Sequence, residues 1–300
     1  MSDKTLLDYS NKGCEGEYVG RILNKLYSSW KIGNCILCAY GNPHSKDVIN
    51  TMVNLKKSNK LKEESKDFIK IAIHFGDENN CIETAYYCFD YVFRFYMPQT
   101  CDMIKVFPLN IGFSSLGMSM DEIKDKAFIE EPRSISERDN DIFFIGQAKI
   151  SNSRDSMFSI KNKLKKLKTL NGDNAKVRIK NTDGFGRGVD IKTYRFLLGS
   201  SKICLVPGGL SPETFRYTEA MASGCIVVTD CSTDVYFYKD SPIIKVDAWD
   251  ENAIKVIQTI LLKPVKELDE IGIASRNYYK RVLSPEASAN YIIDTIDNKK

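Results

Sequence analysis

The sequence predicts an α/β protein with two domains, each built on a parallel β-sheet covered by helices. The chain has 300 residues, and single hydrophobic cores stop growing at roughly 250–300 residues, so two domains are expected. Short apolar runs rich in β-forming residues alternate with longer amphipathic runs, which is the pattern of βα units. A polar, charged stretch between residues 113 and 141 separates two series of such units.

The composition narrows the class of protein. Hydrophobic residues make up 43% of the chain and charged residues 27%, which is ordinary for a globular protein and excludes a disordered or fibrous one. The net charge is only +4, so a dedicated nucleic-acid-binding protein is not expected. No apolar run approaches the roughly 20 residues of a membrane span, and the first residues contain no apolar signal core. We therefore expect a soluble, cytoplasmic protein.

The first domain, residues 1–138, is predicted to contain four strands. The first apolar run, NCILCAY, carries Cys35 and Cys38. Residues three apart on a strand point to opposite faces, so these two thiols are not expected to share a metal ion. The odd number of cysteines, nine, favours reduced thiols over a disulfide framework. With only two histidines in the chain, we predict no metal site. The predicted strands are residues 34–40, 67–75, 91–97 and 103–109.

The second domain, residues 139–285, is predicted to contain five strands, and residues 286–300 form a final helix that returns to the first domain. The lysine-rich stretch 161–168 is interpreted as a solvated helix face. Gly184, Gly186 and Gly188 lack the spacing of a dinucleotide-binding fingerprint, which favours a connecting loop. The predicted strands are residues 141–146, 175–180, 202–208, 225–230 and 242–247.

Residues 200–230 form the most informative segment. A buried strand runs into Pro207-Gly208-Gly209, where small residues allow the backbone to lie close to a ligand. Ser211 is expected to cap a helix that has Pro212 at its first position and ends near residue 223. Ligands of open α/β sheets bind at the carboxyl ends of the strands, and the amides at a helix start suit a diphosphate.

Arg216 and Glu219 are three residues apart and therefore share one face of this helix. A carboxylate in this place can accept both hydroxyls of a ribose, and a guanidinium can neutralise phosphate. An exposed Arg–Glu pair without any function fits the spacing equally well, and both interpretations stay open at this point.

The segment PGGLSPETFRYTEAMASGCIVV resembles the nucleotide-sugar-binding motif of exostosin-like (GT47-type) glycosyltransferases, which have the GT-B fold. Many GT-B enzymes carry two glutamates eight residues apart, but the position eight before Glu219 is Ser211. This departure matches the exostosin-like variant and weakens any claim to a retaining mechanism. The resemblance covers about two thirds of the chain, through FFIGQ (143–147) followed by Arg154, and through IHFGDE (73–78), YVFRFY (91–96) and VFPLNIGF (106–113).

The resemblance implies two Rossmann-like domains with parallel sheets facing across a cleft. It implies transfer of a sugar from a nucleotide sugar, expected to be a UDP-sugar, to a hydroxyl of a glycan or glycoconjugate. Inversion, independence from metals and a role in polysaccharide biosynthesis are expected, with no cofactor besides the donor. A glycolipid acceptor would bring the protein to the inner face of a membrane.

The resemblance also implies roles for individual residues. Glu219 would bind the donor ribose, and Asp77, with Glu78 as its rival, would be the base that takes the acceptor proton. A helix cap or a solvated loop is the alternative interpretation of Asp77. Asp139-Asn140-Asp141 matches a metal-chelating D-x-D pattern, but it precedes a strand, so we interpret it as the start of that strand. The other expected donor contacts are Arg216, Ser211, Pro207, Gly208, Gly209, Arg154 and Gly146.

Two other functions stay open. The chain could be a non-catalytic two-domain protein that binds a nucleotide or a sugar. It could also be a GT-B transferase of another family, of the fucosyl or Kdo type. Release of UDP from UDP-sugars distinguishes an enzyme from a binding protein.

Overall fold

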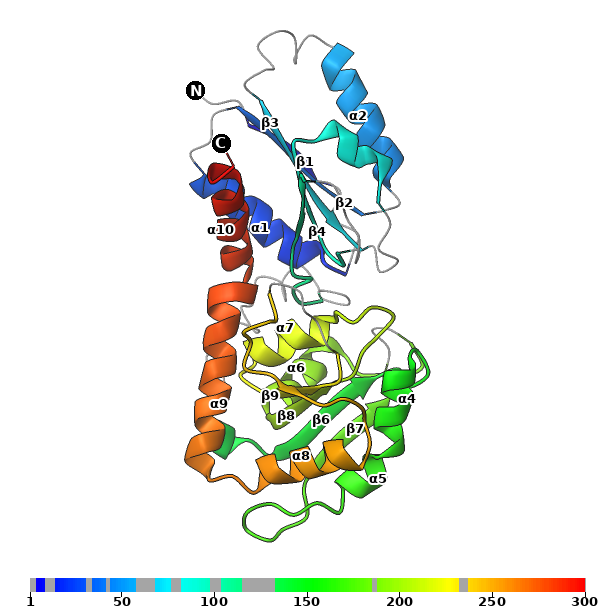
Figure 1. Ribbon diagram of the computed structural model, residues 1–300, viewed down its shortest axis with the longest axis vertical. Coiled ribbons are helices and arrows are strands. Elements are labelled where there is room, and N and C mark those ends of the chain that lie inside the picture. Colours follow the sequence, from blue (N-terminus) through cyan, green and yellow to red (C-terminus); the bar gives the residue numbers. More distant parts are fainter. Residues whose placement is uncertain are drawn as a thin grey trace. The chain divides into compact units, whose positions relative to one another are not determined.

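The computed structural model describes residues 4–8, 14–30, 34–41, 44–57, 68–76, 82–97, 104–114, 133–184, 188–231 and 237–299. The chain divides into two compact units: unit 1 is Met1–Ser115 with Ser284–Lys300, and unit 2 is Leu116–Leu283. Each unit contains one five-stranded sheet in which every strand pair is parallel (Figure 1). The prediction of two parallel-sheet α/β domains is confirmed. No helix in the described ranges has the length and apolar character needed to cross a membrane.

The sheet of unit 1 has the order β1-β2-β3-β4-β5. Its second strand is buried over its whole length, as expected for a parallel strand covered on both faces. The sequence pattern did not reveal β1, a five-residue edge strand in which Leu6 is exposed. The strand bounds are β1 Lys4–Asp8, β2 Cys35–Gly41, β3 Ile69–Phe75, β4 Tyr91–Arg94 and β5 Val106–Pro108.

The helices of unit 1 are α1 Gly16–Ser29, α2 Ser45–Lys57, the 3₁₀ helix η4 Thr84–Cys88 and α10 Pro285–Asp297. A closed hydrogen-bond triad ties α1 to α10: the Tyr18 hydroxyl donates to Asn110 (2.8 Å), the Asn110 amide donates to Ser288 (2.8 Å), and Tyr18 and Ser288 are 2.8 Å apart. Gly112 has φ 67°, and a Cβ there would lie 2.2 Å from the Tyr18 ring. Only glycine fits this position.

The sheet of unit 2 has the order β10-β9-β8-β6-β7. After β6 the chain adds β7 on one side and then crosses to add β8 on the other side. The carboxyl ends of β6 and β8 therefore form a topological switch point, which is where open α/β sheets bind ligands. The strand bounds are β6 Asn140–Gly146, β7 Val177–Asn181, β8 Ser201–Val206, β9 Ile226–Thr229 and β10 Ile244–Lys245.

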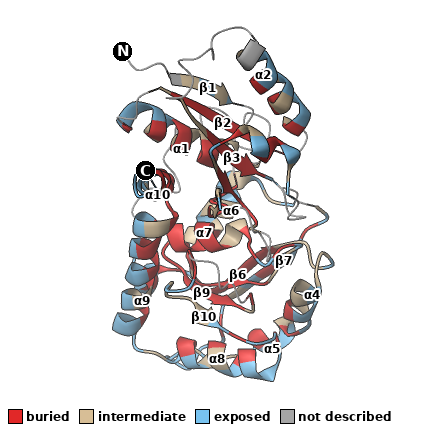
Figure 2. Ribbon diagram, turned by 45° about the horizontal axis from the view of Figure 1, so that its top comes forward, coloured by how far each residue is buried: buried red, intermediate tan, exposed pale blue. Residues whose placement is uncertain are grey.

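The helices of unit 2 cover this sheet over a core that includes Phe144, Leu205 and Trp249. The strands are largely buried, whereas α8 and α9 expose residues along one side (Figure 2). The helix bounds are η5 Ile135–Glu137, α4 Asn152–Ser159, α5 Lys161–Leu164, α6 Ile191–Gly199, α7 Phe215–Ala222, α8 Glu251–Leu261, α9 Val265–Tyr278 and the π-helical turn η6 Tyr279–Leu283.

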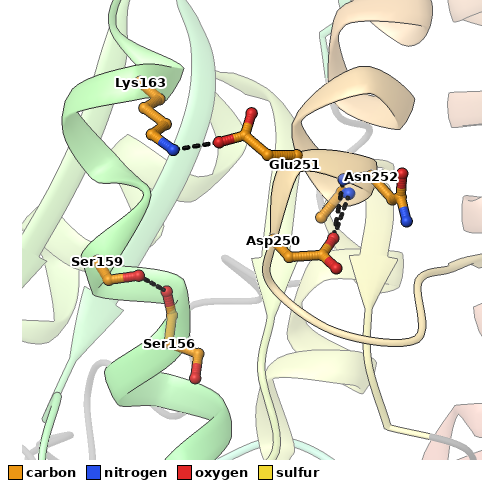
Figure 3. A network of polar contacts seen from close by, with 7 residues as sticks. Ser156, Ser159, Lys163, Asp250, Glu251 and Asn252 are labelled. Carbon is orange, nitrogen blue, oxygen red and sulfur yellow. Dashed lines mark hydrogen bonds and ion pairs between the residues drawn. The ribbon is translucent and has the colours of Figure 1, made fainter.

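The lysine-rich stretch lies on α5 and beyond, with its charged groups in solvent. Lys163, whose side chain is 58% exposed, forms an ion pair with Glu251 at the start of α8 (Figure 3). Asp250 caps α8 by accepting from the amides of Asn252 (2.8 Å) and Ala253 (3.3 Å). Because most of these lysine side chains are exposed, the interpretation as a solvated helix face is confirmed. An exposed ion pair of this kind contributes only about 0–1 kcal/mol to stability.

Candidate functional site

Hydrogen bonds hold the loop after β8 against the start of α4 and the end of β9. The Gly208 amide donates to Ser153 Oγ (2.8 Å) and to Asp230 (3.2 Å), and the Ser151 hydroxyl donates to the Gly208 carbonyl (2.6 Å). A Cβ at Gly208 would lie 3.1 Å from the sulfur of Cys231. Glycine at this position is thus explained by packing against Cys231, which follows β9, whereas the sequence pattern suggested room for a ligand.

Helix α7 begins later than the sequence predicts. Its N-cap is Thr214 and its first residue is Phe215, so the expected cap at Ser211 is wrong. The Gly209 amide donates to the Ser211 carbonyl (3.1 Å), and this local bond keeps Ser211 in the loop. Thr214 makes no side-chain cap bond, and its buried hydroxyl has no hydrogen-bond partner among the described residues. The first turn of α7 therefore still has polar groups to satisfy.

Arg216 joins α7 to the end of β6. Its guanidinium lies 4.4 Å from the centre of the Phe144 ring, and Nη2 donates to the Ile145 carbonyl (2.6 Å). A Cβ at Gly146 would lie 3.0 Å from that nitrogen, so a side chain there would push the guanidinium away. Nε of Arg216 is buried without a hydrogen-bond partner in the described part of the chain. The structure thus brings Arg216 and Gly146 together.

Glu219 lies inside the domain. Its residue is 5% exposed, and Oε2 accepts a hydrogen bond from the hydroxyl of Tyr194 on α6 (2.7 Å). The reading of Arg216 and Glu219 as an exposed surface pair is therefore wrong.

The electrostatics of this group agree with a buried cluster. Burial raises the pKa of Tyr194 well above its ordinary value, and the nearby Glu219 carboxylate adds to the effect. Burial acts to lower the pKa of Arg216, but the neighbouring groups Tyr194, Cys204 and Glu219 outweigh it and raise that pKa. Arg216 is therefore charged at neutral pH.

Arg154 brings a second guanidinium to the same edge. It lies in the first turn of α4, where its amide donates to the N-cap Ser151 (3.2 Å). A Cβ at Gly209 would lie 3.2 Å from Nη2 of Arg154, which shows that this side chain reaches the loop after β8. Within the same loop Pro207 and Ser211 are buried.

The carboxyl edge of the unit 2 sheet therefore gathers two cations, a buried carboxylate and an incompletely capped helix start. Asp77 and Glu78, the expected bases, lie outside the described residues. Sequence reasoning missed Tyr194, because nothing in a helix of mixed composition marks one tyrosine as a partner of Glu219. It also missed Glu213, which is 7% exposed in the loop before α7. Its position inside the segment PGGLSPETFRYTEAMASGCIVV was the one feature of the sequence that could have marked Glu213 as a site residue.

Asp139-Asn140-Asp141 lies at the other edge of the sheet, as the start of β6. Asp141 is 4% exposed and accepts from Lys202 Nζ (2.8 Å) and from the Lys176 amide (2.8 Å). The interpretation of this motif as the start of a strand is confirmed.

The sequence matches no protein-family model and no curated protein. Solved structures share its fold. A glycosyltransferase from Rickettsia africae is 12% identical, with a TM-score of 0.51 over 98% of this chain and 97% of that chain. The N-terminal domain of trehalose-6-phosphate phosphatase from Candida albicans is 13% identical, with a TM-score of 0.50 over 93% of this chain and 74% of that chain. Together with the two five-stranded parallel sheets, this likeness shows that the chain has the GT-B fold.

Proposed function

We propose that this protein is a glycosyltransferase that moves a sugar from a nucleoside-diphosphate sugar to a hydroxyl group of a glycan or glycolipid. A fold alone does not determine a function, so the site must support the reaction. The supporting observation is the meeting of Arg154, Arg216 and the start of α7 at the carboxyl ends of β6 and β8. That edge of an open sheet is where ligands bind.

The diphosphate of the donor would lie against the start of α7. The first-turn amides and the positive end of the helix dipole favour an anion, and the buried Thr214 hydroxyl can donate to a phosphate oxygen. Arg154 and Arg216 add positive charge. The same groups would stabilise the charge that develops on the leaving diphosphate.

The donor ribose is assigned to Glu219. The bond from Tyr194 fixes the orientation of this carboxylate, and an ionised carboxylate offers about four lone-pair sites, so it can accept further hydroxyls. Since Glu219 is 5% exposed, only a small group that enters the site closely can reach it. A ribose edge held by its diphosphate at the start of the same helix meets this condition.

The acceptor side is assigned to unit 1, with an inverting displacement. The acceptor oxygen attacks the anomeric carbon, the bond from that carbon to the diphosphate oxygen breaks, and the acceptor proton goes to Asp77 or to Glu78. A UDP-sugar donor, an exostosin-like motif and independence from a metal belong to this proposal. A metal held by Asp139 and Asp141 is not part of it, because Asp141 already engages Lys202 and Lys176 at the opposite sheet edge.

Calorimetric titration of UDP and of UDP-sugars, followed by measurement of UDP release with and without glycan acceptors, tests this function. We expect binding of both UDP and UDP-sugars, and turnover that accelerates with an acceptor. Binding without any release of UDP would favour a binding protein. Tight binding of another nucleotide in place of UDP would favour a GT-B transferase of a different family.

A further inference from the structure

Unit 2 contains a pocket at the sheet edge opposite the proposed donor site. It holds about 310 Å³ and is lined by residues of the segment before β6, by α9 and η6, and by Gly224 after α7. Arg138 precedes β6 and Gly224 precedes β9, so the pocket lies at the amino ends of the parallel strands. Among the described residues, its charged lining consists of four cations and one carboxylate: Arg133, Arg138, Arg276, Lys280 and Asp269.

Arg138 is a buried cation that is surrounded by neutral acceptors. It is 4% exposed, and its guanidinium donates to the carbonyls of Arg133 (2.9 and 3.2 Å), Ser201 (2.8 Å) and Ser223 (2.8 Å). No carboxylate in the described ranges forms an ion pair with it. A buried charge is costly unless an opposite charge lies near it. Carbonyls at the end of α7 supply only part of that compensation.

Arg276 adds a second guanidinium at the same place. It is 6% exposed on α9, and Nη1 donates to the Ala222 carbonyl in the last turn of α7. Asp269, the one carboxylate among the described lining residues, is already engaged, because it accepts from the Ser134 hydroxyl (2.7 Å) and the Ser136 amide (3.2 Å). Among the described lining residues, cations therefore outnumber carboxylates.

The walls of the pocket are preformed. A Cβ at Gly272 would lie 2.7 Å from Ile135 and 2.9 Å from the Gly224 carbonyl, so α9 packs directly on η5 and on the end of α7. Two cations with exposed side chains, Arg133 and Lys280, line the pocket beside the apolar Ile273. These long, exposed side chains can reach a ligand that enters the pocket.

We propose that this pocket binds the phosphoryl group of a small phosphorylated molecule. Arg133 and Lys280 would donate hydrogen bonds to the phosphoryl oxygens. The buried Arg138 and Arg276 would attract the negative charge of the phosphoryl group without direct hydrogen bonds to it. Four cations against one engaged carboxylate favour a dianion over a carboxylate ligand. A volume of about 310 Å³ suits a sugar phosphate, since small-molecule sites begin at roughly 300 Å³.

Binding here would also bear on α7. Arg138 and Arg276 hold the last carbonyls of this helix, and its first turn carries Thr214 and Arg216. An effect of the phosphorylated ligand on the donor site presupposes the proposed function, but binding itself does not.

The test is titration of inorganic phosphate and of glucose 1-phosphate, at constant ionic strength, into the wild type and the double variant Arg133→Gln/Lys280→Gln. Lys255→Gln/Lys266→Gln is the matched control, because it removes the same charge from exposed positions outside the pocket. Loss of two charge-assisted hydrogen bonds should weaken binding at least roughly tenfold in the first variant and leave the control unchanged. Equal affinities in the two double variants would overturn the proposal.

A third variant separates this pocket from the donor site. If Arg154→Gln loses phosphate binding while Arg133→Gln/Lys280→Gln retains it, the ion occupies the donor site and the proposal fails. The reverse result supports the pocket even if the protein binds no nucleotide sugar.

A lipid arm identifies the source of the phosphoryl group. Phosphatidylglycerol vesicles, with phosphatidylcholine vesicles as reference, are sedimented with the same variants. Sedimentation that is lost in Arg133→Gln/Lys280→Gln, without binding of the soluble phosphates, assigns the phosphoryl group to a lipid headgroup. If neither soluble phosphate nor acidic vesicles bind in a way that depends on Arg133 and Lys280, the pocket is not a phosphoryl site.

Discussion

Replacement of Glu219 by alanine separates ligand binding from structural support at the buried carboxylate. If Glu219 binds two ribose hydroxyls, the variant loses two hydrogen bonds to a charged acceptor, each worth about 1.5–3 kcal/mol. The sum, about 3–6 kcal/mol, corresponds to at least a roughly hundredfold loss of UDP affinity. UDP and the UDP-sugar should lose the same factor, because the contact is to the ribose and not to the sugar.

The structure adds a cost in stability. In Glu219→Ala the part-buried Tyr194 hydroxyl loses its acceptor, which costs about 1–3 kcal/mol of unfolding free energy. Tyr194→Phe/Glu219→Ala removes the orphaned hydroxyl and should recover part of this loss, without restoring the affinity for UDP. Denaturant unfolding measures the change in unfolding free energy, and titration calorimetry measures the affinity for UDP.

Glu267→Ala is the matched control, because Glu267 lies exposed on α9 and pairs with Lys263, just before that helix. It should change neither UDP affinity nor stability by more than about 1 kcal/mol. If folded Glu219→Ala binds UDP as tightly as the wild type does, Glu219 only supports Tyr194 and Arg216, and the assignment of the ribose is refuted.

Four further predictions follow from the proposal and the structure. Asp77→Asn should lower turnover by roughly 10²–10⁴ while donor binding stays, and near-normal turnover would transfer the role to Glu78 or to another group. Sugar transfer should persist in EDTA; recovery by manganese of an activity lost in chelator would contradict a metal-independent mechanism. Gly112→Ala should lower the unfolding free energy by about 2–5 kcal/mol, because its backbone would be strained and its Cβ would clash with the Tyr18 ring. Gly172→Ala is the control: Gly172 also has a positive φ (84°), but a Cβ there meets no described neighbour within 4 Å, so the expected loss is only about 1–2 kcal/mol. Similar losses in the two variants would contradict the clash with Tyr18. Burial acts to raise the pKa of Asp269, but hydrogen bonds from Ser134 and Ser136 outweigh it and lower that pKa. The stability that Asp269 contributes is therefore present above the ordinary aspartate pKa of about 3.9 and is lost as the pH falls through the lower native value, so the difference in unfolding free energy between wild type and Asp269→Asn should become smaller in that range. A difference that is constant from pH 6 to pH 2 would refute this assignment.

The sequence by itself determined the two parallel sheets. Strands that are covered on both faces must be apolar along their length, so β2 and β8 appear as continuous apolar runs that a reader can find without any structure. The sequence pattern does not predict the short edge strand β1. This strand has a neighbouring strand on one side only and exposes Leu6, so it lacks the continuous buried run of an inner strand. The sequence also placed the motif of residues 207–219 at the carboxyl end of a strand, since glycines and a helix pattern follow a buried run.

Only the tertiary structure decided what the motif residues do within the fold. Helix α7 starts after Thr214, and Ser211 lies in a loop with a backbone bond from Gly209, an arrangement that local cap preferences do not predict. Glu219 is buried against Tyr194, 25 residues earlier, and Arg216 donates to Ile145, 71 residues earlier. Such contacts depend on how helices pack on an open parallel sheet. The periodicity of one segment carries no information about the side chain that another segment will place beside it.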